Sequence, residues 1–212
     1  MATKVEPRPA ERVWLLRALL VLQSPRVVFA GIRDDSNEAA HARAEAVLAI
    51  VWLAGMAAVL ASPQMNTLMD DPARNDIGIA TIVVFLAGGM YGALAYVMLS
   101  GVLHAFLRGL GATGSYRRSR HLFAFALMPV ALSLVTFWVV RIAVEGRALF
   151  KYGGADRGHV FADLFYVFVA WTVVLVVLGV RTVLGWSWTR SVAAVGGATA
   201  VATLIVLGTS LL

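Results

Sequence analysis

Five long apolar stretches run along the chain and are separated by shorter, more polar segments. A helix that crosses a bilayer needs about 20 consecutive apolar residues, whereas a helix on a soluble protein keeps one polar face. The last stretch, AVGGATAVATLIVLGTSLL, contains no charged residue and would leave a helix without such a face. The pattern therefore predicts an all-α polytopic membrane protein with five transmembrane helices. The expected spans are residues 44–61, 77–107, 122–144, 163–184 and 191–212.

The basic residues are distributed unevenly around these spans. Lys and Arg near span ends tend to stay on the cytoplasmic side of the membrane. If all five spans form, 13 of the 18 basic residues lie on one side, in the N-terminal segment and in the loops after the second and fourth spans. The rule predicts a multi-pass protein of the cytoplasmic membrane with its N-terminus in the cytoplasm and its C-terminus outside.

Residues 1–43 are expected to form a cytoplasmic segment that precedes a membrane domain at 44–212. An arginine interrupts the apolar run in ERVWLLRALLVLQSP, which disfavours a cleaved secretory signal. Val13, Leu16 and Leu20 share one stripe, as in an amphipathic helix. Such a helix either lies in the membrane interface or packs on the underside of the bundle. The polar stretch RDDSNEAAHARAE then leads into the first span as a short helix or linker.

Composition narrows the possible functions. The chain has no cysteine, so disulfides, thiolate chemistry and cysteine metal sites are excluded. Its net charge of +6 comes from arginines at span ends, where lipid phosphates lie, and no aromatic-basic nucleic-acid motif accompanies it. The expected partner is thus the bilayer, through anionic headgroups on the cytoplasmic side, and not nucleic acid. The excess of Arg over Lys and the many Ala and Val residues are typical of GC-rich bacterial genomes.

The loop GLGATGS places three glycines at the GxGxxG spacing of dinucleotide-binding turns. That fingerprint needs a strand before it and a helix after it, whereas here the loop joins two membrane spans. A turn in which Thr113 or Ser115 caps the next helix is the simpler interpretation. The helix start and its arginines also form a candidate site for a lipid headgroup. The residues of this candidate motif are Gly111, Thr113, Gly114, Ser115, Tyr116, Arg117, Arg118 and Arg120.

Polar side chains within or near spans are candidates for function. Tyr91, Ser100 and His104 lie on the second span, and the last two are one turn apart and share a face. A hydrogen bond between helices explains them better than a serine nucleophile, which would also need an exposed turn and an oxyanion hole. Arg141 and Asp163 lie near the outer ends of neighbouring spans, where they could pair or extend separately to the interface.

No catalytic, cofactor or metal site is expected. The cluster of Asp70, Asp71 and Asp76 lacks the spacing of an EF-hand loop and has a proline within it, as in a solvated turn. Pro129 is expected to kink the third span. Small residues such as Gly88, Gly92 and the pair 196–197 would let helices approach closely.

Three stretches make the chain resemble the Yip family of membrane proteins (the Ypt/Rab-interacting-protein domain). SPRVVFAGIRDD is similar to the proline-containing lead-in to the first span, and the shared residues are Pro25, Arg26 and Phe29. GATGSYRRSRHLFAFALMPVAL is similar to a Gly-Thr-Gly-Ser loop followed by a span with an early proline; the matches are Gly111, Thr113, Gly114, Ser115, Tyr116 and Pro129, with Ala112 inserted. The last two spans match at Trp171, Gly179, Ser187 and Ala193.

The resemblance implies a non-enzymatic five-span protein with a cytoplasmic N-terminus. Eukaryotic members are associated with small GTPases, but bacteria lack that Rab machinery, so only the fold and topology are expected to carry over. The favoured function is a membrane scaffold or accessory subunit, which assembles with itself or with another membrane protein. The alternative is a lipid-handling protein or small-solute carrier, which would need a polar cavity between its spans.

Overall fold

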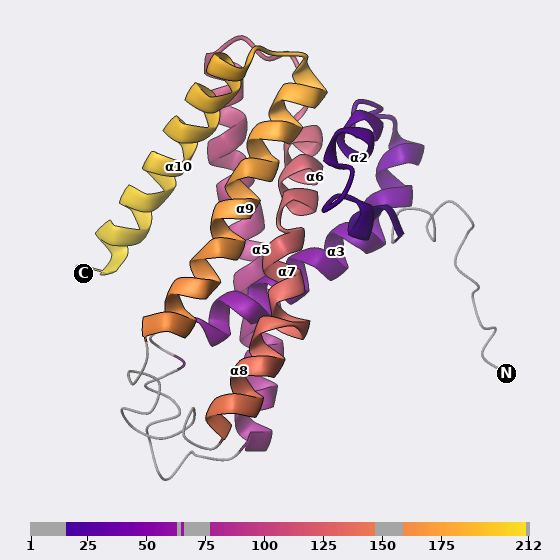
Figure 1. Ribbon diagram of the computed structural model, residues 1–212. Helices are drawn as coiled ribbons and strands as arrows, with labels where there is room; N and C mark the ends of the chain where they lie inside the picture. The colour runs from indigo at the N-terminus through magenta and orange to yellow at the C-terminus, as the bar shows by residue number, and fades with distance from the viewer. Residues whose placement is uncertain (1–15, 63–64, 66–76, 147–158, 211–212) are drawn as a thin grey trace, which may run out of the picture.

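The computed structural model describes residues 16–62, 65, 77–146 and 159–210, and the regular elements in these ranges are α-helices. Short helices open the described chain, and long helices follow (Figure 1). The helices are α2 (Pro25–Gly31), α3 (Asn37–Leu60), α5 (Ile77–Gly109), α6 (Tyr116–Ala126), α7 (Met128–Val135), α8 (Phe137–Glu145), α9 (His159–Leu184) and α10 (Trp188–Ser210). The all-α fold expected from the hydropathy pattern is thus what the chain adopts in these ranges.

Four of the helical segments are long and apolar enough to cross a membrane. They are Asn37–Leu60, Thr81–Gly109, Tyr116–Val144 and Asp163–Leu184, within the described residues. These segments correspond to the first four expected spans. The fifth expected span forms a helix, α10, of 23 residues, but α10 is not among these four segments.

The first membrane helix begins at Asn37, seven residues before the expected boundary at residue 44. Ser36 explains this early start, because its side chain accepts a hydrogen bond from the backbone N–H of Ala39 and so caps the helix. Arg43 does not interrupt it, because this side chain is fully buried against the protein. The polar stretch expected as a short helix or linker is therefore divided between a loop and the first turns of α3.

The third span is not one continuous helix. It begins at Tyr116, six residues before the expected start, and is interrupted at Leu127 and at Thr136 to give α6, α7 and α8. The first interruption lies directly before Pro129, which stands in the first turn of α7. Proline has no N–H and its ring displaces the carbonyl four residues earlier, so a helix breaks there.

Helices α3 and α5 cross at three glycines. A Cβ atom on Gly55 would lie 2.7 Å from the Cα of Gly92 and 2.8 Å from its N, and closer still to the carbonyl oxygen of Gly88. A Cβ on Gly88 would lie 2.7 Å from the Cα of Met56. The two backbones are thus in direct contact, which only glycine permits.

The N-terminal elements lie at one end of the bundle. The α5–α6 and α9–α10 loops are at this end, and α2 lies beside it (Figure 1). Phe29 and Ile32 are fully buried, and the ring of Phe29 packs where a side chain on Gly179 of α9 would stand. α10 starts at the same end, runs beside α9 (Figure 1) and packs on α5 and α9. This end of the bundle therefore brings together the N-terminal segment, the α5–α6 loop and the α9–α10 loop.

Candidate functional site

Asp35 is at the centre of a polar cluster between the α2–α3 loop and the start of α6. Its Oδ1 accepts a hydrogen bond of 3.1 Å from Nε of Arg117, and its Oδ2 accepts one from the hydroxyl of Ser115. A second nitrogen of Arg117 donates to the backbone carbonyl of Asp35, and Nη1 donates to Oδ1 of Asn37 at 2.6 Å. Nε of Arg118 lies 4.0 Å from Oδ2 of Asp35. We call this set of contacts the Asp35 clasp.

The environment of Asp35 stabilises its ionised form. Partial burial of the carboxyl on its own would raise its pKa. The hydrogen bonds from Ser115 and Arg117, together with the charges of Arg117 and Arg118, outweigh that burial and hold the pKa of Asp35 below its usual range. The clasp is therefore an ion pair across the physiological pH range.

Other arginines at this end bind main-chain carbonyls. Arg33 donates from Nε to the carbonyl of Thr182 on α9 at 3.0 Å, and Nη2 of Arg118 donates to the carbonyl of Arg33 at 2.9 Å. The buried Arg43 donates to the carbonyls of Gly31 at 3.3 Å and Asp34 at 2.7 Å. These charge-assisted bonds satisfy carbonyls of the α2–α3 turn and one carbonyl in the last turn of α9, where helical partners end.

The glycine-rich loop is a turn with a capped helix after it. Gly111 has a φ of +87°, a left-handed conformation that favours glycine. Ser115 caps α6 by accepting a hydrogen bond of 3.1 Å from the backbone N–H of Arg118. Arg190 donates to the carbonyl of Leu110 and so ties the loop to the start of α10. Of the two residues considered as caps, Ser115 has this role.

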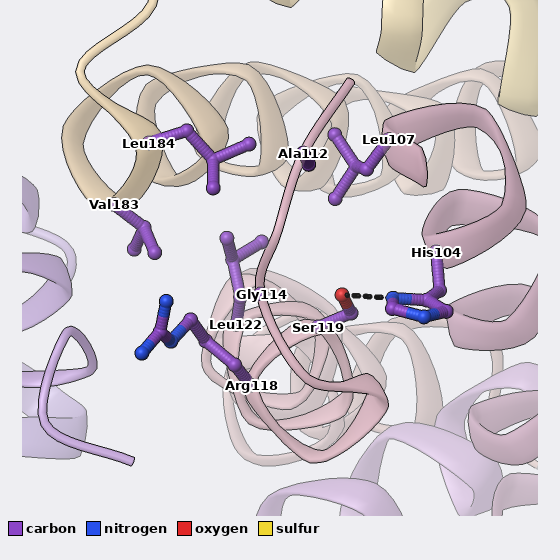
Figure 2. A pocket seen from close by; sticks show the side chains of 9 residues that line it. All are labelled: His104, Leu107, Ala112, Gly114, Arg118, Ser119, Leu122, Val183 and Leu184. Carbon is purple, nitrogen blue, oxygen red and sulfur yellow. Dashed lines mark hydrogen bonds between the residues drawn. The ribbon is translucent and has the colours of Figure 1, made fainter. Parts of the chain in front are cut away.

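Hydrogen bonds between side chains connect α5 to α6 within the apolar part of the bundle. Nδ1 of His104 lies 3.0 Å from Oγ of Ser119, a hydrogen bond drawn in Figure 2. The hydroxyl of Tyr116 donates to the carbonyl of Val97 at 2.7 Å and lies 3.3 Å from Oγ of Ser100. Contacts of this kind between helices are what the sequence analysis preferred over a catalytic serine.

Arg120 adds a cationic contact to this region. Its guanidinium carbon lies 5.1 Å from the centre of the Tyr116 ring and 5.9 Å from that of Tyr96. An arginine over an aromatic face gains from the ring's electron distribution, more so away from water. Arg120 thus sits among aromatic rings of α5 and α6.

A small cleft lies beside His104 (Figure 2). The loop that carries Ala112 and Gly114 runs across it, and Arg118 lies on its rim. Its free volume is about 10 Å³, close to the least that one water molecule needs. The cleft as it stands has no room for a lipid headgroup or a small solute.

The remaining polar candidates lie away from this cluster. Tyr91 is on the exposed face of α5, with about half of its surface accessible. Arg141 is buried on α8 with its guanidinium carbon 5.1 Å from the centre of the Trp138 ring, whereas Asp163 is exposed on α9. The structure therefore brings Ser100 and His104 near the loop motif and leaves Tyr91 outside it. The suggested pairing of Arg141 with Asp163 stays a prediction.

Within the described residues, no group of three or more histidine, aspartate or glutamate side chains could hold a metal ion. The acidic cluster of Asp70, Asp71 and Asp76 lies outside the described residues.

The sequence analysis missed the importance of Asp35, Arg33 and Arg43. It treated the first as part of a polar linker and the two arginines as topological charges. A signal was available, because the acidic pair in RDDSNE lies on the same expected side of the membrane as the basic stretch YRRSR. Opposite charges in two loops on one side of a bundle are expected to attract.

No curated protein and no solved structure matches the chain. The family described as the Yip1 domain matches residues 19–210. The matched range covers nearly the whole described chain, from the N-terminal helices to the end of α10. It includes the three stretches on which the resemblance was based. The chain is a membrane-embedded protein with several apolar helices, and it belongs to the Yip1 domain family.

Proposed function

We propose that this protein acts without enzymatic activity, as a membrane scaffold or an accessory subunit of a membrane complex. The observation that carries the proposal is that the polar groups at the end where the loops gather bind one another. Asp35 is bound by Ser115 and Arg117, and His104 is bound by Ser119. Because these polar side chains fix the loops to one another, they favour a protein that presents a stable surface to a partner.

The proposal includes five spans, with α10 as the fifth. A helix of 23 residues is about 34 Å long, which is enough to cross a hydrocarbon core of about 30 Å. An odd number of spans places the two termini on opposite sides of the membrane, and the basic residues place the N-terminus in the cytoplasm and the C-terminus outside, in the cytoplasmic membrane of a bacterium. The hydrogen bonds from Arg33 to Thr182 and from Arg190 to Leu110 support this topology, since they join basic loops that the rule places together.

A lipid-headgroup site at residues 111–120 remains part of the proposal in a narrower form. Arg117 and Arg118 already bind Asp35 and main-chain carbonyls, so a phosphate would have to compete with those contacts. Arg108, just before this loop, is exposed at the same end, whereas Arg190 already donates to the carbonyl of Leu110. Arg108 is therefore the better candidate for contact with anionic headgroups.

The alternative function is that of a lipid-handling protein or a small-solute carrier. The cleft between His104 and Arg118 favours it, because a polar group and a cation there border an otherwise apolar lining. Transport through it would require the loop at residues 110–115 to move away from α5. The same loop is tied at both ends, by Arg190 and by Asp35.

The test compares assembly with flux. The purified protein is placed in lipid nanodiscs for native mass spectrometry, and in vesicles that contain a fluorescent phospholipid for a flip assay. We expect a homo-oligomer, or a stoichiometric complex with a co-purified membrane protein, and lipid flipping no faster than in protein-free vesicles. The matched variants are His104→Ala, in the cleft, and Tyr91→Ala, on the exposed face. A monomer whose flip rate falls in the first variant and not in the second would replace the scaffold with the carrier.

A further inference from the structure

The N-terminal described segment, residues 16–31, has two opposite faces. One face packs on the bundle through side chains with almost no exposed surface: Ala18, Val21, Val28 and Phe29. The other face exposes large apolar side chains: Leu16 with 66%, Leu19 with 53%, Leu20 with 47% and Val27 with 75% of the surface accessible. We call this second set the outward leucine face, Val27 included. An apolar patch of this kind on a segment so firmly seated needs an occupant.

The level at which the segment sits along α9 indicates that occupant. Phe29 packs at Gly179, which lies five residues before the last residue of α9. At 1.5 Å per residue, that contact is about 8 Å from the end of the helix. A helix that lies in the membrane interface buries its apolar face about 5–10 Å into the boundary between headgroups and acyl chains. The segment is therefore held beside a membrane-spanning helix at the depth of the boundary between headgroups and acyl chains.

The charges on the segment fit the same surroundings. Arg26 is exposed next to Val27 of the outward leucine face. Arginine in such a position can bury its methylene stem in the apolar layer and reach a lipid phosphate with its guanidinium group. An exposed face with large apolar side chains and an arginine is complementary to an anionic leaflet, which offers acyl chains to the first and phosphates to the second.

We propose that residues 16–31 form a membrane-surface element, with the outward leucine face inserted into the anionic leaflet at this end of the bundle. The bundle holds the element through Phe29 and through Arg33, which binds the carbonyl of Thr182 in the last turn of α9. Such an element increases the cross-section of the protein in one leaflet and not in the other. The inference depends on membrane embedding and on neither the scaffold role nor the direction of insertion.

The test measures where a label on this face resides. The chain has no cysteine, so a single spin label can be placed at Leu19→Cys or at Val27→Cys without removing native thiols. The labelled protein is reconstituted in nanodiscs of equal parts phosphatidylcholine and phosphatidylglycerol. Electron paramagnetic resonance then gives collision rates with oxygen, which enters lipid, and with a water-soluble nickel chelate. Val174→Cys on the exposed face of α9 is the lipid reference, and Glu38→Cys is the water reference.

We expect the ratio of oxygen to nickel collisions at Leu19→Cys and Val27→Cys to be several-fold above that at Glu38→Cys and to approach that at Val174→Cys. A ratio equal to that of Glu38→Cys would mean that the face is in water and would overturn the proposal. Low rates with both reagents would mean that protein covers the face, either a second copy or a partner, and would overturn it as well.

The charge requirement has its own control. Arg26→Glu, combined with the label at position 27, should lower the ratio in nanodiscs that contain phosphatidylglycerol and should change it less in phosphatidylcholine alone. An equal change in both lipids would remove the anionic leaflet from the proposal. Because Arg26 is exposed, this variant is not expected to disturb the buried face.

Discussion

The glycine crossing of α3 and α5 allows a direct test of how the bundle is held together. In Gly55→Ala, the new Cβ would lie 2.7 Å from the Cα of Gly92 and 2.8 Å from its N, and it would overlap the carbonyl oxygen of Gly88. The atoms it meets belong to the backbone, so no change of rotamer can relieve the overlap. The two helices would have to move apart along the most extensive helix–helix contact of the described chain.

Two opposing effects set the magnitude. Alanine in place of glycine stabilises a helix interior by about 0.5–1 kcal/mol. Insertion of an atom into a packed contact costs about 1–3 kcal/mol, and sometimes more. Because a backbone cannot yield as a side chain does, the cost in Gly55→Ala should be at or above the upper end. We expect the free energy of unfolding to fall by about 2 kcal/mol.

The assay is unfolding in mixed micelles, with the proportion of sodium dodecyl sulfate increased and helix content followed by circular dichroism. Gly196→Ala is the matched control, because nothing lies within 4 Å of a Cβ at that exposed position on α10. The control should be as stable as the parent or slightly more stable. If Gly55→Ala also unfolds at or above the parent's midpoint, the close crossing does not hold the bundle, and the reasoning fails.

Three further predictions concern the polar contacts. Arg43→Met leaves the carbonyls of Gly31 and Asp34, in partly buried hydrogen bonds, without their charged donor and should lower the free energy of unfolding by about 2 kcal/mol in the same micelle assay. Tyr116→Phe removes the hydroxyl that donates to Val97 and should cost about 1 kcal/mol. The pKa of Asp35 is lowered in the folded protein, so the unfolded chain binds more protons and the stabilisation from this carboxylate is complete above the unfolded value of about 3.9. That stabilisation is lost as the pH falls through the folded pKa, so the melting temperature of the parent should drop more steeply below about pH 4 than that of Asp35→Asn.

Each of these has an outcome that contradicts it. Equal stability of Arg43→Met and the parent would show that the turn carbonyls find other donors. An unaltered midpoint for Tyr116→Phe would mean that the hydroxyl exchanges its protein partner for water without loss. If the melting temperatures of the parent and of Asp35→Asn fall equally as the pH is lowered, Asp35 has no ion pair in the folded state. Arg26→Gln, at an exposed position of α2, is a suitable control for loss of one arginine.

Hydropathy was enough to predict the all-α membrane fold and to locate the first four spans, because the need to bury backbone polar groups in lipid leaves few alternatives. The ends of the helices were harder to predict, since they depend on tertiary contacts. The helix start at Asn37 is set by the cap at Ser36, and the first turns include Arg43, which is buried although an arginine in a sequence is normally taken as exposed. Pro129 identified where the third span changes direction, but nothing in the local sequence indicated the second interruption at Thr136.

The candidate site was predicted only in part for a related reason. The loop with Ser115 and its arginines was recognisable from residue types within a few positions of one another. The partner of these arginines, Asp35, precedes the first membrane helix, so two membrane helices separate it from them in the sequence. Hydropathy and local motifs carry no information on how two loops on the same side are paired, because that pairing depends on how the spans are arranged.

The Asp35 clasp has a consequence for how the chain is made. Arg117 follows Asp35 by 82 residues, and the contact between Arg33 and Thr182 spans 149 residues. A ribosome therefore completes the first membrane helix long before the residues that hold its N-terminal turn have been synthesised. The hydrogen bonds from Arg43 to Gly31 and Asp34, and the cap that Ser36 provides, are local in sequence and do not depend on later helices. The clasp on Asp35 can form only once the start of α6 has been synthesised, and the bond from Arg33 to Thr182 only once α9 has been synthesised.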